Sequence, residues 1–209
     1  MRKFRLMAFA LVIIFNSCIT KQNSLTYDKG VTINGVKWAT RNVDKSGTFA
    51  KNPEDTGMLY QWNNTQCFTL SSQYYWNSDW NGNNAAVWET ANNVCPTGWR
   101  VPTPEELQSL TGASYKLTTI NGIYGHTFGN GKHQIFLPLA GKIYHTYGSY
   151  YNYGKTGNYW SNKASSHLSH EDKIAAIIMG ITVTSNNDEY YVIQPHPRAD
   201  GKSVRCVAE

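Results

Sequence analysis

One cluster of histidine and carboxylate side chains in this sequence could bind a transition metal. It is His167-x-x-His170-Glu171-Asp172, and on a helix His167 and Glu171 would share a face. The serines around the cluster indicate a loop instead, and the spacing fixes no third ligand. We interpret the cluster as a solvated turn, and we predict neither a bound metal nor a cofactor. A metal-dependent enzyme at this cluster is an alternative that elemental analysis would test.

A second stretch has the start of a calcium-binding pattern. Asn77-x-Asp79-x-Asn81-Gly82 places oxygen-bearing side chains at the first, third and fifth positions of a loop, with glycine at the sixth. However, the first position is Asn rather than Asp, and the bidentate acid due at the twelfth position falls on Trp88. An asparagine-rich turn accounts for this pattern without calcium.

The sequence contains no pattern of a nucleophilic or acid–base catalyst. It lacks a Gly-x-Ser-x-Gly elbow, and no residue at a recognisable spacing from Cys67 can be assigned as its general base. Glu105 and Glu106 are adjacent, so on a helix they point in different directions and cannot flank a glycosidic bond. We therefore predict that the chain is not an enzyme.

Aromatic side chains are the strongest remaining signal for binding. Aromatics make up 13% of the sequence and charged residues only 16%, and many tyrosines lie next to Asn, Gly and Ser. Flat rings beside adaptable hydrogen-bonding groups suit the face of a sugar or a patch of protein. We expect Trp38, Trp62, Trp99 and Trp160 to lie in the core. The side chains expected to be exposed and to bind a ligand are Trp76, Trp80, Tyr147, Tyr150, Tyr151 and Tyr153.

The N-terminus has the pattern of an export signal. Residues 1–17 begin with basic residues, continue with an apolar run too short to span a membrane, and end in Ser17 before Cys18. This predicts a lipoprotein signal peptide over 1–17, lipid (palmitate) attachment at Cys18, and a polar tether over 18–30. Phe15 replaces the leucine usual in such signals, and an ordinary cleaved signal is the alternative. The predicted location is the cell envelope, as an outer-membrane lipoprotein facing the periplasm or the cell surface.

Charge argues against a nucleic-acid partner. The signal segment carries three of the 19 Lys and Arg residues and none of the 14 Asp and Glu, which leaves a net charge of +2 from 16 basic and 14 acidic residues. So small a surplus does not support a basic nucleic-acid face. Besides Cys18, three cysteines remain, Cys67, Cys95 and Cys206, and one disulfide pair is expected in an exported protein.

Local patterns predict short strands and a short helix. Asn34-Gly35 predicts a hairpin over 31–38. Thr103, Pro104 and Glu106 form a capping box that begins a helix over 104–111. An asparagine-rich insertion at 63–93 is long enough that we expect it to be functional or mobile. The other expected strands are 57–62, 134–138, 142–144, 174–184, 190–194 and 203–207.

Several sequence blocks resemble those of a known family. They are Trp38-Ala-Thr-Arg-Asn42, Gly57-Met-Leu-Tyr-Gln-Trp62, Cys95-Pro-Thr-Gly-Trp-Arg-Val-Pro-Thr103, Leu137-Pro-Leu-Ala-Gly141, Gly157-Asn-Tyr-Trp-Ser161 and Ser203-Val-Arg-Cys-Val207. Together and in this order they resemble the Fibrobacter succinogenes major paralogous domain, found in exported proteins and lipoproteins. The resemblance covers 31–209 as a single domain. It implies an α+β, C-type-lectin-like fold of short antiparallel strands with one or two short helices and long loops. The family has no established catalytic residues.

The resemblance also implies which cysteines pair. A disulfide near the C-terminus is common in that fold, and this indicates a link between Cys95 and Cys206. Such a link closes a loop of about 110 residues, which in the chain-entropy model stabilises the fold by about 4–5 kcal/mol. Cys67 would then be unpaired.

The sequence as a whole predicts a lipid-anchored, non-catalytic binding module of the cell envelope that recognises a glycan or a protein ligand. Its contact with the membrane would be the lipid anchor, and nucleic acid is not an expected partner. The alternative is a structural or accessory subunit of a surface assembly such as a pilus or an adhesin.

Overall fold

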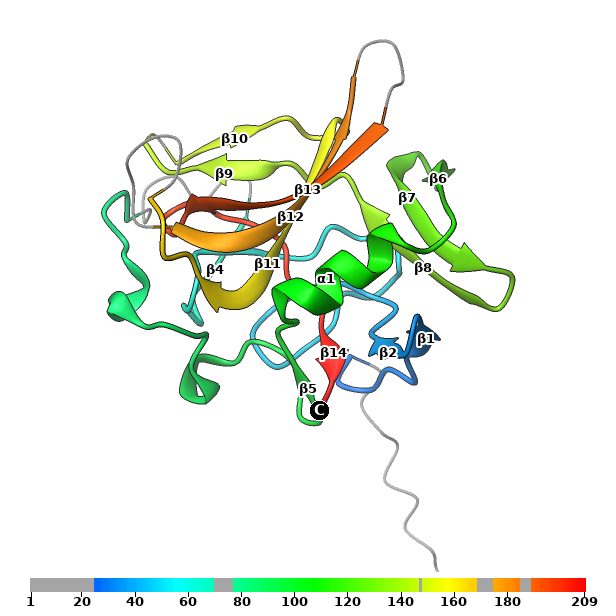
Figure 1. The fold of residues 1–209 in the computed structure, drawn as a ribbon, viewed down its shortest axis with the longest axis horizontal. Helices are drawn as coiled ribbons and strands as arrows, with labels where there is room; N and C mark the ends of the chain where they lie inside the picture. The colour runs from blue at the N-terminus through cyan, green and yellow to red at the C-terminus, as the bar shows by residue number, and fades with distance from the viewer. Residues whose placement is uncertain (1–24, 70–76, 147, 169–174, 185–188) are drawn as a thin grey trace, which may run out of the picture.

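Strands joined by tight turns make up most of the fold (Figure 1). A computed structural model describes residues 25–69, 77–146, 148–168, 175–184 and 189–209. Of these, 44% lie in strands or bridges and 8% in helices, with one α-helix. The predicted C-type-lectin-like α+β fold is therefore wrong: the described chain is mostly β, in several small antiparallel sheets. The reason is that segments with only weak strand patterns, such as 115–130, pair into long hairpins through tight turns.

The first sheet joins the two ends of the described chain in the order β1-β2-β14-β5. Asn34 and Gly35 both have positive φ, at 48° and 82°, which is the turn that an Asn-Gly hairpin requires. This confirms the predicted hairpin. Figure 1 shows the C-terminal strand lying beside β5 and β2. The strands are β1 Val31–Ile33, β2 Val36–Trp38, β14 Val207–Ala208 and β5 Trp99–Arg100.

The second sheet is a three-stranded meander in the order β6-β7-β8. Asn121 and Gly122 also have positive φ and join β6 to β7, so this hairpin uses the same turn chemistry as the hairpin of β1 and β2. The strands are β6 Tyr115–Ile120, β7 Ile123–Asn130 and β8 His133–Pro138.

The third sheet, β11-β12-β13, is apolar on one face, and its other face carries polar side chains beside the buried Trp160 and Ile178. Tyr159, Met179 and Ile181 are fully buried on the face that packs beneath the helix. Alternate residues face the other way and include Asn158, Thr182 and Gln194, because side chains alternate along a strand. The strands are β11 Thr156–Ala164, β12 Ala175–Val183 and β13 Glu189–Pro197.

Two strand pairs and three helical segments complete the described chain. The regular strand in the predicted 57–62 segment is limited to β3. The strand pairs are β3 Leu59–Tyr60 with β4 Cys67–Phe68, and β9 Lys142–Tyr144 with β10 Ser149–Tyr151. The helical segments are α1 Pro104–Thr111 and the short 3-10 helices η2 Gly82–Asn84 and η3 Thr90–Asn92.

Helix α1 spans the predicted range and begins at the predicted capping box. Thr103 Oγ1 accepts a hydrogen bond from the Glu106 backbone N–H, and the Glu106 carboxylate accepts one from the Thr103 N–H. Arg100 binds both oxygens of Glu106, at 2.8 and 2.7 Å. Leu107 and Leu110 are fully buried against the third sheet, so packing holds this two-turn helix.

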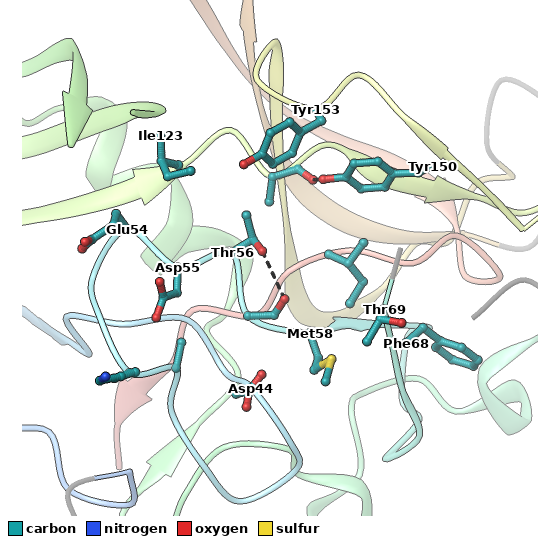
Figure 2. Close-up of a pocket in the computed structure, with 15 residues that line it drawn as sticks. Asp44, Glu54, Asp55, Thr56, Met58, Phe68, Thr69, Ile123, Tyr150 and Tyr153 are labelled. Carbon is teal, nitrogen blue, oxygen red and sulfur yellow. Dashed lines mark hydrogen bonds between the residues drawn. The ribbon is translucent and has the colours of Figure 1, made fainter. Parts of the chain in front are cut away.

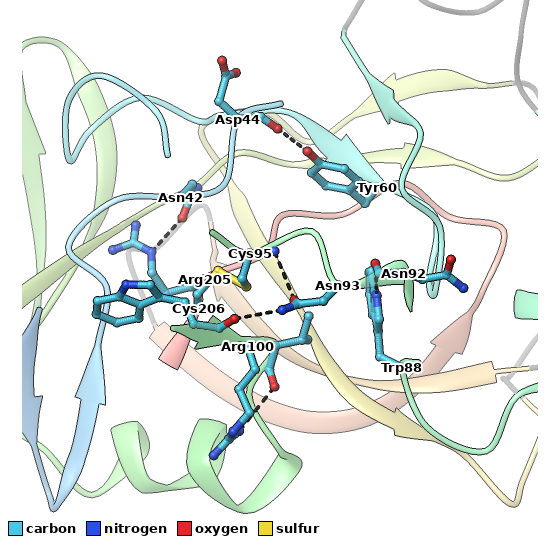
Figure 3. Close-up of a disulfide and its surroundings, with 12 residues drawn as sticks. Asn42, Asp44, Tyr60, Trp88, Asn92, Asn93, Cys95, Arg100, Arg205 and Cys206 are labelled. Atoms are coloured by element: carbon cyan, nitrogen blue, oxygen red, sulfur yellow. Dashed lines mark hydrogen bonds between the residues drawn. A yellow bond between two sulfur atoms is a disulfide. The ribbon is translucent and has the colours of Figure 1, made fainter. Parts of the chain in front are cut away.

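A disulfide between Cys95 and Cys206 ties the middle of the chain to its end, as the resemblance implied (Figure 3). The Asn93 side chain holds the backbone before Cys95 in place. It accepts a hydrogen bond from the Cys95 N–H and donates one to the Trp99 carbonyl. The disulfide packs in an apolar cluster with Trp62, Trp99 and other buried side chains.

The predicted strand at 203–207 is wrong except at its last residue. Ser203 makes an isolated parallel bridge to Tyr159, and regular pairing resumes only at Val207. Arg205 between them is fully buried, and its guanidinium donates to Asn42 Oδ1 and to the carbonyls of Ala39 and Phe136. These hydrogen bonds tie residue 205 to three segments of the chain.

Candidate functional site

One candidate site is a cavity of about 500 Å³ that we call the tyrosine cleft (Figure 2). The loop 44–58 lies on one side, and Tyr150 and Tyr153 lie on the other. A cavity of this size is within the range of small-molecule sites, on the order of 300–1,000 Å³. Its main lining residues are Asp44, Lys51, Glu54, Asp55, Thr56, Met58, Phe68, Thr69, Ile123, Tyr150 and Tyr153.

The two tyrosines form an aromatic wall. Their ring centroids are 5.8 Å apart. The Tyr150 hydroxyl donates to the Ala140 carbonyl, and burial raises the pKa of Tyr150, so its hydroxyl stays protonated at neutral pH. Tyr150 also packs with Leu59, Phe68 and Ile143. Tyr153 is 47% exposed, which leaves its ring available to a ligand.

Carboxyl groups line the opposite side of the tyrosine cleft. Glu54 accepts a hydrogen bond from Asn121 Nδ2 at 2.6 Å, and Asp55 accepts one from the Asn52 N–H at 2.8 Å. The Asp44 side chain accepts no hydrogen bond from the described residues and lies near Met58 in Figure 2. These groups therefore keep acceptor positions open toward a ligand.

Gly57 brings the two parts of this loop close together. Its φ is +66°, and a Cβ at this position would lie 2.1 Å from the Val43 carbonyl oxygen. Only glycine tolerates both conditions without a backbone shift. The neighbouring Met58 N–H then donates to the same Val43 carbonyl at 3.1 Å, which holds the loop edge in place.

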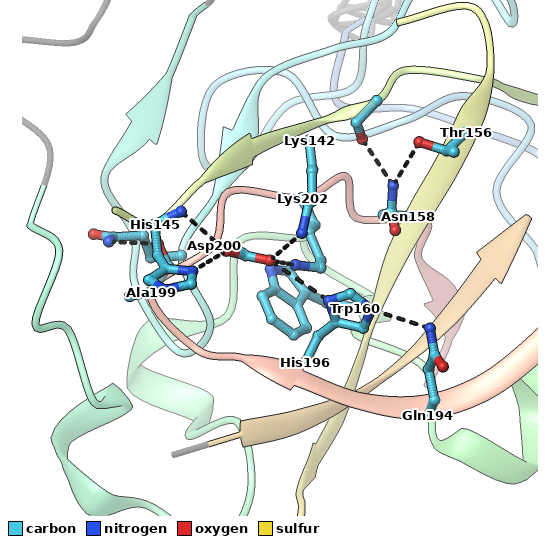
Figure 4. A network of polar contacts seen from close by, with 12 residues as sticks. Lys142, His145, Thr156, Asn158, Trp160, Gln194, His196, Ala199, Asp200 and Lys202 are labelled. Carbon is cyan, nitrogen blue, oxygen red and sulfur yellow. Dashed lines mark hydrogen bonds and ion pairs between the residues drawn. The ribbon is translucent and has the colours of Figure 1, made fainter. Parts of the chain in front are cut away.

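A buried ion network holds β9 and the loop after it in position (Figure 4). It consists of Asp200, Lys142, Lys202, His145 and His196, and we call it the Asp200 network. Asp200 is fully buried and binds the Lys142 ammonium at 3.0 Å, the Lys202 ammonium, and both the backbone N–H and Nδ1 of His145. The β9–β10 hairpin that carries Tyr150 is thus fixed to the end of the chain.

Burial and the charges in this network shift the pKa values of Asp200 and His196. Burial alone would raise the pKa of Asp200, but the Lys202 ammonium and the two histidines lower it well below its ordinary value. Burial, followed by the charge of Lys202, lowers the pKa of His196 to about 4. His196 is therefore neutral at pH 7, while Asp200 is ionised.

The structure brings two of the predicted ligand-binding residues together, Tyr150 and Tyr153. Tyr151 is 55% exposed, and its side chain lines a different hollow. Trp80 is half-buried rather than exposed, and its indole N–H donates to the Trp62 carbonyl at 2.7 Å. The predicted core tryptophans, Trp38, Trp62, Trp99 and Trp160, are all buried. Cys18, Trp76 and Tyr147 lie outside the described residues.

The structure describes the start of the calcium-like pattern and one residue of the histidine cluster. Asn77 Oδ1 accepts a hydrogen bond from the Asp79 N–H, which closes a turn. His167 is exposed, and His170, Glu171 and Asp172 lie outside the described residues. Within the described ranges, no group of three or more His, Cys, Asp or Glu side chains is placed to hold a metal ion.

Sequence reasoning missed the carboxyl side of the tyrosine cleft. Asp44, Glu54 and Asp55 fall in a stretch that the sequence indicates only as loop. The available signal was their proximity to each other in a chain with few charged residues. Even so, only the folded loop places them opposite Tyr153.

Comparisons of the chain with protein-family models, with curated proteins and with solved structures find no match. The resemblance to the Fibrobacter succinogenes major paralogous domain therefore stays a prediction. Among the described residues, no helix has the length and apolar character needed to cross a membrane.

Proposed function

We propose that this chain is a non-catalytic binding module of the cell envelope that recognises a glycan through the tyrosine cleft. The observation that carries the proposal is the pairing of an aromatic wall, Tyr150 and Tyr153, with the carboxyl groups of Asp44, Glu54 and Asp55 across one cavity. Aromatic rings pack against the C–H face of a sugar, and carboxylates accept hydrogen bonds from its hydroxyl groups.

A concave site favours a glycan over a protein surface as the ligand. Protein interfaces bury about 800 Å² on each partner and are usually broad. The tyrosine cleft is instead a hollow of about 500 Å³, suited to one or two sugar rings.

The envelope location is supported by the sequence of the N-terminus. Residues 1–17 have the signal pattern, and Cys18 follows at the position of a lipidated cysteine. The fold holds the chain from Asp28, whose buried carboxylate accepts hydrogen bonds from the Gly30 N–H, Thr40 and Arg41. A lipid at Cys18 would thus be joined to the domain by a short connection. Loss of palmitate incorporation in Cys18→Ser tests this part of the proposal.

A glycan array with the full chain purified in detergent tests the binding function. We expect bound glycans, and we expect Tyr153→Ala to weaken their binding about tenfold by removing the exposed ring. Tyr124→Ala is the matched control, because Tyr124 is also exposed, at 54%, but does not line the tyrosine cleft.

Three results would contradict the glycan proposal. The array could show no binding, the two tyrosine variants could bind equally well, or only proteins could be captured. Co-purification of a defined membrane assembly without any glycan binding would favour the structural or accessory subunit instead.

A further inference from the structure

A second hollow, of about 290 Å³, lies on the other side of the β9–β10 hairpin from the tyrosine cleft. Tyr151 pairs with Lys142 across the hairpin, whereas Tyr150 pairs with Ile143, so the two adjacent tyrosines face opposite sides. Tyr151 and Lys142 line the second hollow together with Val192 and several polar side chains of the third sheet. We call this hollow the sheet groove.

Strand register explains how the floor of the sheet groove is assembled. Asn158 of β11 pairs with Gly180 of β12, which pairs with Val192 of β13. Thr182 and Gln194, two residues away along their strands, face the same side. The central position is glycine, so no side chain fills the middle of the floor.

Asn158 lines the sheet groove and has an unused acceptor on its side-chain amide. Its Nδ2 donates to the Gly141 carbonyl and to Thr156 Oγ1, both at 3.2 Å. A carbonyl can only accept, so this bond fixes which end of the amide is nitrogen. Asn158 is 7% exposed, and within the described chain its Oδ1 accepts no hydrogen bond. An acceptor left open in a nearly buried side chain indicates a ligand that donates a hydrogen bond.

Gln194 offers a second acceptor of the same kind. Its Nε2 lies 3.0 Å from His196 Nε2, and His196 Nδ1 lies 3.5 Å from the Asp200 carboxylate. A proton on Nδ1, facing that carboxylate, leaves His196 Nε2 to accept from the glutamine amide. This leaves Gln194 Oε1 facing outward from an exposed residue. The Asp200 network lies beneath and holds His196, so the amide is oriented before any ligand arrives.

Two tyrosine rings stand at the edges of the sheet groove. Tyr151 is 55% exposed and Tyr190 is 49% exposed, and they come from the hairpin and from β13. The cation in the lining, the Lys142 ammonium, is already bound to Asp200 at 3.0 Å and lies 5.0 Å from the Tyr144 ring. The sheet groove therefore presents rings, amide oxygens and hydroxyls with its positive charge already paired.

We propose that the sheet groove is a second binding site, and that its ligand is a neutral saccharide of one or two rings. Sugar hydroxyls supply the donors that Asn158 and Gln194 lack, and Tyr151 and Tyr190 pack against the faces of the ring. This site is separate from the tyrosine cleft and does not depend on a glycan binding there.

Gly180 provides a direct steric test. An added Cβ would lie 3.2 Å from Val192 Cγ2, the end of a rotatable side chain, and 3.8 Å from Gln194 Nε2. A Cβ at position 180 therefore requires Val192 to move by a few tenths of an ångström, and a valine would occupy the floor where the saccharide lies.

The experiment is calorimetric titration of the full chain in detergent with cellobiose, maltose and chitobiose, and with a galacturonic acid disaccharide as the anionic probe. NMR mapping of backbone and side-chain amides locates each bound sugar. We expect at least one neutral disaccharide to shift the amides of Gly180 and Gln194. Gly180→Val should weaken that binding at least tenfold, and Gln194→Ala about fivefold through one lost hydrogen bond.

Tyr153→Ala is the control that separates the two sites, because it removes a ring from the tyrosine cleft and leaves the sheet groove intact. Groove binding that persists in Tyr153→Ala supports the second site even if the tyrosine cleft binds no glycan. Gln194 is exposed, so its alanine variant keeps the test valid should Gly180→Val fail to fold. The proposal is overturned if no neutral disaccharide shifts these amides, if only the galacturonic acid probe does, or if Gln194→Ala binds as tightly as wild type.

Discussion

The two faces of the β9–β10 hairpin border hollows that are built in different ways. The tyrosine cleft is completed by the loop 44–58, whose shape depends on Gly57 and on a few backbone contacts. The sheet groove rests on three paired strands, with the Asp200 network beneath one end. A site on a loop can change its residues at little cost to the fold, whereas a site on a sheet shares its residues with the structure that stabilises the molecule. Substitutions in the tyrosine cleft should therefore change binding more than stability, whereas substitutions beneath the sheet groove should change stability.

The largest contrast should come from removing the buried carboxylate. Asp200→Asn leaves the Lys142 and Lys202 ammonium groups without the charge that they share, and we expect a loss of about 3–5 kcal/mol in the free energy of unfolding. Asp44→Asn in the tyrosine cleft should change it by less than about 0.5 kcal/mol, since Asp44 is partly exposed. Urea denaturation of both variants measures the difference. Equal losses would show that the two sides are coupled to the fold in the same way.

Reduction of the disulfide should weaken both sides together. Cys95 and Cys206 are 111 residues apart, and removing a link of this kind costs about 2–5 kcal/mol. A Cys95→Ser, Cys206→Ser double variant should therefore unfold at lower urea, with both hollows lost in the same transition. Cys67→Ser is the control, because the sulfur of Cys67 is in no disulfide. Retention of wild-type stability in the double variant would contradict this expectation.

Acid should destabilise the side that holds the Asp200 network. The folded pKa of His196 is about 4, below its ordinary value, so between about pH 6.5 and pH 4 the unfolded chain binds a proton that the folded chain does not. The free energy of unfolding should fall over this range by up to about 3 kcal/mol. Below the ordinary pKa of aspartate, protonation of Asp200 in the unfolded chain adds a further loss.

Denaturation of wild type and His196→Gln at pH 7, 5.5 and 4 measures this dependence. Lys142, Lys202 and His145 surround the same carboxylate, so the variant isolates the histidine contribution. A wild-type stability that stays constant from pH 7 to pH 4.5 would rule out a His196 with this pKa.

The smallest effect should be local to the tyrosine cleft. Gly57→Ala places a Cβ against the Val43 carbonyl at a positive φ, and we expect a loss of about 1–3 kcal/mol together with weaker binding in the cleft. Gly35→Ala is a control with positive φ but no neighbour within 4 Å of the added Cβ, so it carries only the conformational part of the cost. Binding of a neutral disaccharide in the sheet groove should be unchanged in both. A weaker sheet groove in Gly57→Ala would mean that the two hollows are not independent.

Local signals in the sequence predicted local structure correctly. The capping box at Thr103 and Glu106 begins α1, and Asn34-Gly35 turns the first hairpin. These features depend on hydrogen bonds and backbone preferences within a few residues, which is why a sequence displays them. The overall fold class was predicted wrongly because it rested on a resemblance, while the pairing of segments such as 115–130 depends on contacts with distant strands.

The candidate sites show the same division. Tyrosine-rich segments were recognisable from composition, but composition does not say which of Tyr150, Tyr151 and Tyr153 share a hollow. Asp200 carried no recognisable motif, since its partners come from positions 142, 145, 196 and 202.

By itself, the sequence determined the turns, the helix cap, the buried tryptophans and an excess of ring-bearing residues without a catalytic pattern. Only the tertiary structure decided that adjacent tyrosines face different hollows and that a single carboxylate binds two lysines below one of them. The physical reason is the separation in sequence between the residues that interact. Turn and cap energies arise between neighbours in the chain, whereas a cavity and a buried ion pair exist only after segments far apart in sequence are packed together.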